Sequence, residues 1–201
     1  MSFIEKKYNK YCHQSSDINE HLPTLYKYAK ECTHITECGV RGAVSSYAFA
    51  NGLRDKTDAR LIMVDLCGCD NIDICLDECE NEGIRATFYE ESDLTCPMEP
   101  TDLLFIDTWH VYGHLVKELK RWNTYVGKYI ILHDTTVDGD VGESVRNNWD
   151  IGKQSIDSGL SEEDIRKGLW PAIEEFIQEH GNWRVLERFT NNNGLTVLLR
   201  E

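Results

Sequence analysis

The sequence predicts a single α/β domain, in which a mostly parallel sheet is covered by helices on both faces. Short apolar runs alternate with helical patterns between residues 34 and 134, and this order is typical of βαβ units. The run "LLFI" at residues 103–106 has no polar position, as expected of a strand buried on both faces. Near the end, "NNNG" at residues 191–194 separates two apolar runs and predicts a closing antiparallel hairpin. A chain of 201 residues is long enough for one domain with a full core.

The predicted elements follow one another with short connections. Residues 1–33 form an N-terminal helical segment, in which Ser15, Ser16 and Asp17 can cap a helix that runs to about Cys32. The predicted strands are residues 34–38, 60–65, 84–92, 102–107, 128–134, 182–189 and 194–201. The predicted helices between them are residues 42–51, 71–82, 111–125 and 169–181. Residues 135–168 are polar and irregular, too long for an ordinary connection, and we interpret them as a candidate lid over the substrate.

Composition limits the classes of partner. With 35 acidic and 21 basic residues, the formal charge is −14. This charge argues against nucleic acid and against an anionic membrane surface, and it favours a neutral or cationic small ligand. The chain shows neither a signal-peptide pattern nor a run of membrane-spanning length, so we expect a cytoplasmic protein with reduced thiols. Oligomeric state, including a homo-oligomer, stays open.

Acids and glycines gather where the first strands end. "ECGVRG" at residues 37–42 gives the spacing E-x-G-x-x-G, with Glu37 where a dinucleotide-binding fingerprint has its first glycine. Gly39 and Gly42 would let the backbone approach a ligand closely, although a plain tight turn is the alternative. Asp65 ends the second strand, where an acid can accept hydrogen bonds from ribose hydroxyls, and Asp93 follows the third strand. Either acid alone could instead cap a helix.

These features resemble the class I S-adenosylmethionine-dependent methyltransferases over nearly the whole chain. The resemblance implies a Rossmann-like, doubly wound, three-layer α/β/α fold with seven strands. It also implies that Glu37, Gly39 and Gly42 hold the methionine part of S-adenosylmethionine, Asp65 the ribose and Asp93 the adenine. "IDTWH" and "ILHDTT" resemble the metal-dependent sugar O-methyltransferases of the macrocin and mycinamicin type and the cephalosporin-hydroxylase-like proteins.

Two further motifs predict the reacting centre. The fourth and fifth strands are neighbours in such a fold, so Asp107 should lie near His133 and Asp134, where carboxylates can bind Mg²⁺. A bound metal lowers the pKa of a sugar hydroxyl, and His110 suits the role of catalytic base. In the sugar enzymes, Asp-x-x-His at this place supplies a metal ligand and the base, which matches Asp107 and His110. His133 stands where those enzymes have an acid, which leaves three interpretations: a softer metal such as Mn²⁺, a His133 that supports a metal ligand without binding the ion, or no metal and two catalytic histidines.

Weaker candidates surround this centre. Trp109, Tyr112, Trp149 and Trp170 could stack on a sugar, although core packing is the commoner fate of a tryptophan. His21 resembles part of a segment that covers the cofactor, with a helix-surface histidine as the alternative. We expect His114, one turn after His110, to be a solvated surface residue. The sulfur pattern Cys67, Cys69, Cys75 and Cys79 does not have a common structural-zinc spacing.

The sequence therefore predicts an O-methyltransferase that acts on a hydroxyl of a sugar or glycan. A phenol-type small-molecule O-methyltransferase and a non-catalytic cofactor-binding module are the alternatives. A nicotinamide-dependent oxidoreductase is disfavoured, because Glu37 stands where a pyrophosphate demands glycine.

Overall fold

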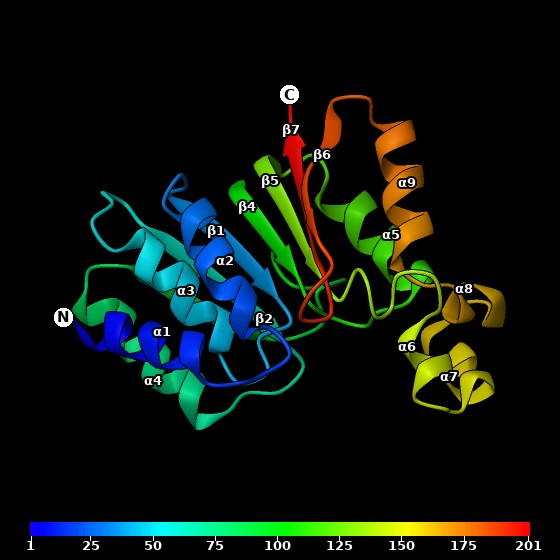
Figure 1. Ribbon diagram of the computed structural model, residues 1–201, viewed down its shortest axis with the longest axis horizontal. Coiled ribbons are helices and arrows are strands. Elements are labelled where there is room, and N and C mark those ends of the chain that lie inside the picture. Colours follow the sequence, from blue (N-terminus) through cyan, green and yellow to red (C-terminus); the bar gives the residue numbers. More distant parts are fainter.

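A seven-stranded mixed sheet forms the centre of the structure, a computed structural model of residues 1–201 (Figure 1). Its strand order is β3-β2-β1-β4-β5-β7-β6, with β1 to β5 parallel and β7 antiparallel to both β5 and β6. The strands are β1 (His34–Cys38), β2 (Arg60–Asp65), β3 (Arg85–Glu90), β4 (Thr101–Ile106), β5 (Val126–His133), β6 (Trp183–Phe189) and β7 (Leu195–Arg200). The predicted parallel sheet with a closing hairpin is confirmed.

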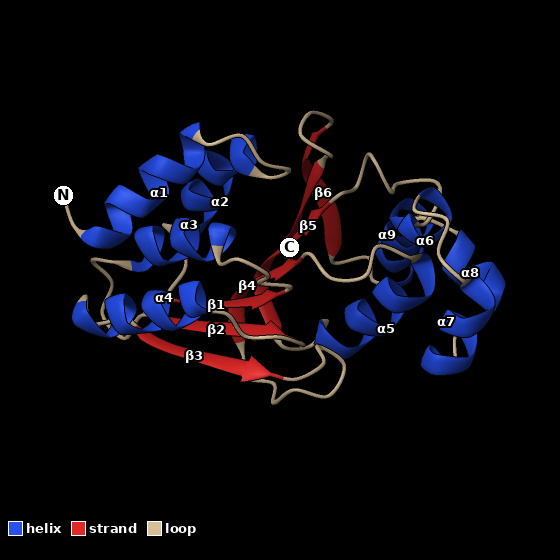
Figure 2. Cartoon of the chain, turned by 90° about the horizontal axis from the view of Figure 1, so that it is seen from below, coloured by secondary structure: helices blue, strands red, loops and turns tan.

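Helices cover both faces of the sheet and complete three layers (Figure 2). One face carries α1 (Phe3–His13), α2 (Leu22–Ala29), α3 (Val44–Leu53) and α4 (Asp70–Asn81), and the other carries α5 (Tyr112–Trp122) and α9 (Leu169–Glu179). The apolar positions of α5 recur at helical spacing, and Leu115, Leu119 and Trp122 are buried against the sheet.

The apolar strand β4 shows why its sequence has no polar alternation. Successive side chains point to opposite faces of a strand. Leu103 and Phe105 belong to the hydrophobic core under α1 to α4, whereas Leu104 and Ile106 belong to the core under α5 and α9. Because both faces are covered, the positions from Leu103 to Ile106 are all apolar until the strand leaves the sheet at Asp107.

The N-terminal segment is helical, but it is divided differently from the prediction. The hydroxyl of Ser2 caps α1, and the hydroxyl of Ser16 accepts the amide N–H of Asn19 in a tight turn rather than starting a long helix. A short 3₁₀ turn, Asn19–His21, then leads into α2, whose first turn contains Pro23.

The segment 135–168 is ordered rather than irregular. It contains three short helices, α6 (Glu143–Arg146), α7 (Ile151–Ser158) and α8 (Glu162–Arg166), the last two capped by Asp150 and Ser161. These helices form a lobe beside α5 and α9 (Figure 1). Val111, Ile151, Leu160 and Ile165 form its small hydrophobic cluster. None of the helices in the structure combines the length and the apolar character needed to cross a membrane.

Candidate active site

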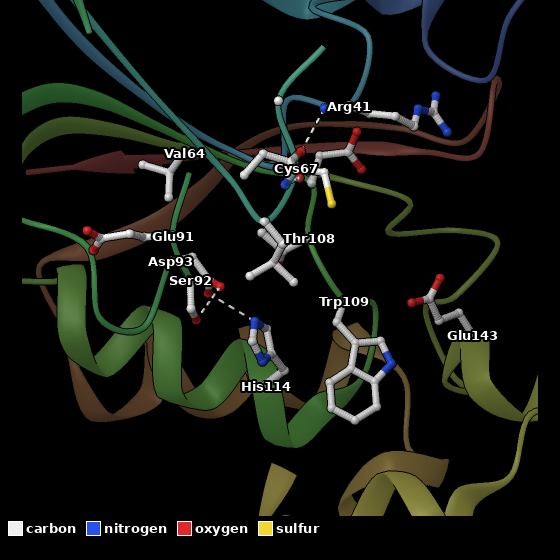
Figure 3. Close-up of a pocket in the computed structure, with 15 residues that line it drawn as sticks. Arg41, Val64, Cys67, Glu91, Ser92, Asp93, Thr108, Trp109, His114 and Glu143 are labelled. Atoms are coloured by element: carbon white, nitrogen blue, oxygen red, sulfur yellow. Dashed lines mark hydrogen bonds and ion pairs between the residues drawn. The ribbon is translucent and has the colours of Figure 1, made fainter. Parts of the chain in front are cut away.

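A cavity of about 590 Å³ opens at the carboxyl ends of β1, β2 and β4 (Figure 3). This edge, where the strand order reverses between β1 and β4, is where open α/β sheets bind ligands. The volume lies within the range of small-molecule sites. Gly39, Asp65, Asp93 and Asp107, all named from the sequence, line the cavity.

Gly39 is required by the close approach of two strand ends. Its φ is +88°, and a Cβ at this position would collide with the backbone carbonyl of Asp107. The turn continues with left-handed backbone at Arg41 and Ala43, whereas Gly42 has open space around the position of a Cβ. The structure therefore gives a steric reason for glycine at position 39 and none at position 42.

Asp65 fixes this turn from the end of β2. Its Oδ2 accepts the amide N–H groups of Val40 and Arg41, both at 2.7 Å, and its Oδ1 accepts that of Cys67 at 3.2 Å. The carboxylate lies in the cavity wall. Oδ2 is filled by its two amides, whereas Oδ1 has lone-pair capacity left for a ligand hydroxyl.

Glu37 lies beneath the cavity rather than in its wall. Its side chain is fully buried, and its two oxygens accept the hydroxyls of Ser45 and Ser46 in the first turn of α3. Burial raises the pKa of Glu37 to about 8, even though both serine hydroxyls favour the ionised form. Neither Glu37 nor Gly42 lines the cavity.

Asp93 and His114 meet in the cavity wall (Figure 3). Nε2 of His114 lies 2.9 Å from Oδ2 of Asp93, and the His114 side chain is only 13% exposed. The expectation of a solvated His114 is therefore wrong, because the first turn of α5 directs this ring toward the loop after β3. Burial raises the pKa of Asp93, but the bond to His114 outweighs it and the net shift is downward.

Asp107, His133 and Asp134 come together as expected from neighbouring strand ends. In the parallel pairing, Ile106 lies opposite Leu132, which places Asp107 beside His133. Nδ1 of His133 lies 3.2 Å from Oδ1 of Asp107 and 3.5 Å from Oδ2 of Asp134. Ligand atoms of the three side chains lie within 4.8 Å of one another, close enough to share a metal ion.

Two details of this cluster fit a metal ion. Oδ1 of Asp134 is buried and has no hydrogen-bond partner, a costly arrangement unless something else binds it. Nε2 of His133 faces the backbone carbonyls of Asp17 and Asn192 at 3.1 and 3.3 Å, so Nε2 carries a proton and Nδ1 is the nitrogen directed toward Asp107 and Asp134.

His110 lies between carboxylates on both sides of its ring. Nε2 is 3.1 Å from Asp107, and Nδ1 is 3.0 Å from Asp134, 3.2 Å from Asp138 and 3.4 Å from Glu143. Burial lowers the pKa of His110, but the hydrogen bonds to Asp107, Asp138 and Glu143 outweigh burial and raise the pKa well above its ordinary value. These carboxylates therefore favour the protonated form of the ring.

The aromatic candidates separate into two groups. Trp109 lines the cavity, with its Nε1 donating to the hydroxyl of Ser144 at 3.1 Å, and it shares a second, shallow hollow with the half-exposed Trp149. Tyr112 instead donates to Glu175 on α9 at 2.6 Å, and Trp170 packs under the guanidinium of Arg188. Neither of these two lines the cavity.

His21 is buried behind the cluster of Asp107, His133 and Asp134 rather than exposed on a helix. Its ring centre lies 5.8 Å from that of His133, and its Nε2 faces the carbonyls of Asn191 and Asn192 in the hairpin turn. The N-terminal segment therefore supports His133 from behind and does not reach the cavity wall.

Sequence reasoning missed Asp138, Glu143 and Glu118. Asp138 is fully buried and paired with Arg146 at 2.6 Å, and Glu143 lines the cavity from α6. Sequence spacing offered a signal for two of them. Asp138 stands four residues after Asp134, and Glu118 stands four residues after His114 on the same helix.

Comparison with solved structures places the chain in one fold. No protein-family model matches it, and no curated protein matches its sequence. The S-adenosylhomocysteine-bound methyltransferase PaMTH1 of Podospora anserina matches with a TM-score of 0.60 and 15% identity, covering 98% of this chain and 87% of that one. An O-methyltransferase of Bacillus cereus in complex with S-adenosylhomocysteine matches with a TM-score of 0.61 and 14% identity, covering 98% of this chain and 90% of that one. TomG of Streptomyces achromogenes is an O-methyltransferase of tomaymycin synthesis, solved with S-adenosylmethionine. It matches with a TM-score of 0.61 and 15% identity, covering 100% of this chain and 90% of that one.

These likenesses establish the fold. The chain has the Rossmann-like methyltransferase fold, with a seven-stranded sheet, a C-terminal antiparallel hairpin and helices on both sides. Identities of 14–15% carry no information about substrate.

Proposed function

We propose that the protein is an S-adenosylmethionine-dependent O-methyltransferase whose acceptor is a hydroxyl group of a sugar or glycan. The observation that carries the proposal is a ligand-sized cavity at the carboxyl edge of a methyltransferase fold, beside a cluster of carboxylates and imidazoles suited to activating a hydroxyl. The fold alone would not distinguish catalysis from cofactor binding.

In this proposal, three residues meet the cofactor. Gly39 gives it access to the backbone of the first turn, Asp65 accepts its ribose hydroxyls, and Asp93 accepts its adenine amino group. Oδ2 of Asp93 bonds to His114. Oδ1 accepts one long hydrogen bond of 3.3 Å from the hydroxyl of Ser92, so it can accept a second one from the adenine amino group. Glu37 would act at the methionine end indirectly, by holding the start of α3 through Ser45 and Ser46, and Gly42 would act there as part of the turn that leads into α3.

Asp107, His133 and Asp134 would hold a divalent metal, Mg²⁺ or Mn²⁺. The unpaired Oδ1 of Asp134 and the direction of His133 Nδ1, toward both carboxylates, support this assignment, and the imidazole favours Mn²⁺ over Mg²⁺. Such an ion supplies Lewis acidity, which lowers the pKa of a bound hydroxyl.

His110 would take the proton of the acceptor hydroxyl as the oxygen attacks the sulfonium methyl group. A protonated ring cannot do so, and the surrounding carboxylates favour protonation. A cation on Asp107 and Asp134 would offset part of their negative charge. The base role of His110 therefore depends on the metal.

The lobe of residues 135–168 would close over the acceptor. Glu143 lines the cavity from this lobe and contacts His110, so movement of α6 would change access to the reacting centre. Trp109 and Trp149 would present their rings to the acceptor at the same boundary.

A phenol-type acceptor is the second candidate. One of the solved structures with this fold is a putative caffeoyl-CoA O-methyltransferase from Staphylococcus aureus, with a TM-score of 0.59 and 15% identity. Thermal shift with S-adenosylhomocysteine and with NAD tests the cofactor, because only a ligand that binds the folded state raises the midpoint. Methyl transfer from labelled S-adenosylmethionine to panels of sugars, nucleotide sugars, glycans and catechols then tests the acceptor. If S-adenosylhomocysteine produces no shift and no panel member is methylated, the proposal fails.

A further inference from the structure

A buried carboxylate in α5 has one oxygen without a partner. Glu118 is 1% exposed, and its Oε1 accepts the hydroxyl of Thr108 at 2.8 Å. Its Oε2 is buried and makes no hydrogen bond. An unpaired carboxylate oxygen away from water is costly, so a group that binds Oε2 would strongly stabilise this arrangement.

The unpaired oxygen faces two other ligand-type side chains. Oε2 of Glu118 is 4.0 Å from Nε2 of His114, which lies one helical turn earlier on the same face of α5. Asp93 approaches from the loop after β3, with its Oδ2 2.9 Å from the same nitrogen. Ligand atoms of all three lie within 4.8 Å of one another.

Charge at this cluster is left uncompensated by the rest of the chain. Asp93 and Glu118 form ion pairs with His114 alone, and neither pairs with a lysine or an arginine. Asp138, by contrast, is buried to a similar degree and has the guanidinium of Arg146 against it. Two buried carboxylates with one imidazole between them leave an excess of negative charge, which a bound cation or a proton on one of the carboxyl groups can balance.

We propose that Asp93, His114 and Glu118 form a second divalent-cation site, distinct from the Asp107–His133–Asp134 cluster. One imidazole and two carboxylates suit Mn²⁺, Fe²⁺ or Zn²⁺ better than Mg²⁺. Asp93 and His114 line the cavity, so the open side of the site faces the cavity and water can complete the coordination. The hydroxyl of Thr108 on Oε1 of Glu118 acts as the outer hydrogen bond that orients a metal ligand.

A cation here would join the loop after β3 to α5. These two segments carry the cavity wall at Asp93 and His114, so the ion would stiffen that side of the cavity. Only Oδ2 of Asp93 is needed as a ligand, which leaves Oδ1 for a bound small molecule.

Binding of Mn²⁺ alone, followed by electron paramagnetic resonance and equilibrium dialysis, tests the site. Mn²⁺ has little affinity for thiolates, so the exposed Cys67 and Cys69 do not contribute. The measurement uses the full chain with Asp134→Asn or, separately, Asp107→Asn, either of which weakens the other cluster. In both backgrounds we expect a remaining Mn²⁺ site that Glu118→Gln weakens by at least about 100-fold. The exposed Glu80→Gln on α4 is the matched control and should leave binding unchanged.

His114→Gln serves as a second variant, and circular dichroism establishes that each variant is folded. Mn²⁺ binding that is equal with and without Glu118→Gln and His114→Gln would overturn the proposal. It would equally be overturned if neither background binds Mn²⁺. If Glu118→Gln then also becomes more stable than its parent as pH rises, the result would assign a shared proton, rather than a cation, to Asp93 and Glu118. Because no activity is measured, failure here leaves the proposed methyl transfer untouched.

Discussion

Nδ1 of His133 and Oδ1 of Asp107 lie 3.2 Å apart across the carboxyl ends of β5 and β4. The contact follows from parallel pairing of the two strands, and it does not depend on any loop. Nε2 of His133 is already committed to the carbonyls of Asp17 and Asn192, so the ring cannot turn to offer its other nitrogen. This rigidity suits a metal ligand, whose position must hold within a few tenths of an ångström.

The first prediction concerns metal preference at this cluster. We expect the protein to bind Mn²⁺ more tightly than Mg²⁺, because one ligand is an imidazole, and His133→Ala to reduce that preference by roughly 10-fold. Calorimetric titration of each metal, made in the Glu118→Gln background so that only this cluster responds, measures the ratio. Glu163→Gln, exposed on the surface of α8, is the control. An unchanged ratio in His133→Ala would exclude His133 as a ligand.

The second prediction concerns Asp65 and the cofactor. Asp65→Ala should weaken S-adenosylmethionine binding by about 1–3 kcal/mol, because ribose hydroxyls lose their acceptor and the amides of Val40 and Arg41 lose theirs. Asp102→Ala is a matched control, since Asp102 also accepts two backbone amides, those of Thr33 and His34, but at the opposite edge of the sheet. Calorimetry should show normal affinity in Asp102→Ala. Equal losses in the two variants would point to general destabilisation.

The third prediction concerns the lobe formed by residues 135–168. If α6 to α8 close over the acceptor, limited proteolysis of the free protein should cut within this lobe first. Its packing rests on a small cluster that includes Ile151 and Leu160, which is weak support compared with the two large cores. S-adenosylhomocysteine together with an acceptor should slow the cutting, as mass spectrometry of the fragments would record. Unchanged cutting with both ligands present would mean that this lobe is not a lid.

The fourth prediction concerns the buried Glu37. Its carboxyl has a pKa of about 8 in the folded protein, against 4.5 as the ordinary value. Below pH 4.5 the Glu37 carboxyl is protonated in both the folded and the unfolded protein, so its burial lowers the stability no further. As pH rises from there to about 8, only the unfolded state loses its proton readily, so the folded state is progressively destabilised, and above about 8 the loss is constant.

Glu37→Gln removes this titration and keeps an acceptor for the serine hydroxyls. It should therefore be more stable than the wild type by a few kcal/mol at pH 9, at about 1.4 kcal/mol per pKa unit, with the difference vanishing near pH 4. Urea unfolding across that pH range, without cofactor, provides the comparison. A stability difference that does not change with pH would mean that Glu37 is ionised in the folded protein.

The fold was accessible from the sequence because its signals are local. The apolar run through Leu103 and Phe105 predicts a strand covered on both faces, and Asn-Asn-Asn-Gly predicts a turn, which the structure shows with positive φ at Asn192, Asn193 and Gly194. The proximity of Asp107 and His133 is predictable from the sequence, because the ends of neighbouring parallel strands lie side by side.

The rest depended on side-chain direction, which periodicity does not give. His114 looked like a surface residue because the first turn of a helix is often exposed, yet the loop after β3 brings Asp93 over it. Glu37 was expected at the ligand, but its carboxylate points down onto Ser45 and Ser46. The spacing of Asp138 from Asp134 marks it only as a candidate, and the fold of the lobe places it against His110.

The last prediction concerns His110 as the base. His110→Ala should keep S-adenosylhomocysteine binding but lose turnover by roughly 10²–10⁴-fold, the usual contribution of a positioned base, and its residual activity should rise with pH as hydroxide replaces it. His13→Ala, which replaces an exposed histidine at the end of α1, should have normal turnover.

Carboxylates raise the pKa of His110, so the neutral, active ring predominates only on the alkaline side of that pKa. A metal ion on Asp107 and Asp134 should shift this acidic limb of the wild-type pH–rate profile to lower pH, and partial chelation with EDTA should shift it back upward. Normal turnover in His110→Ala would move the search for the base to His133, and full activity of the wild type in excess EDTA would contradict the metal dependence.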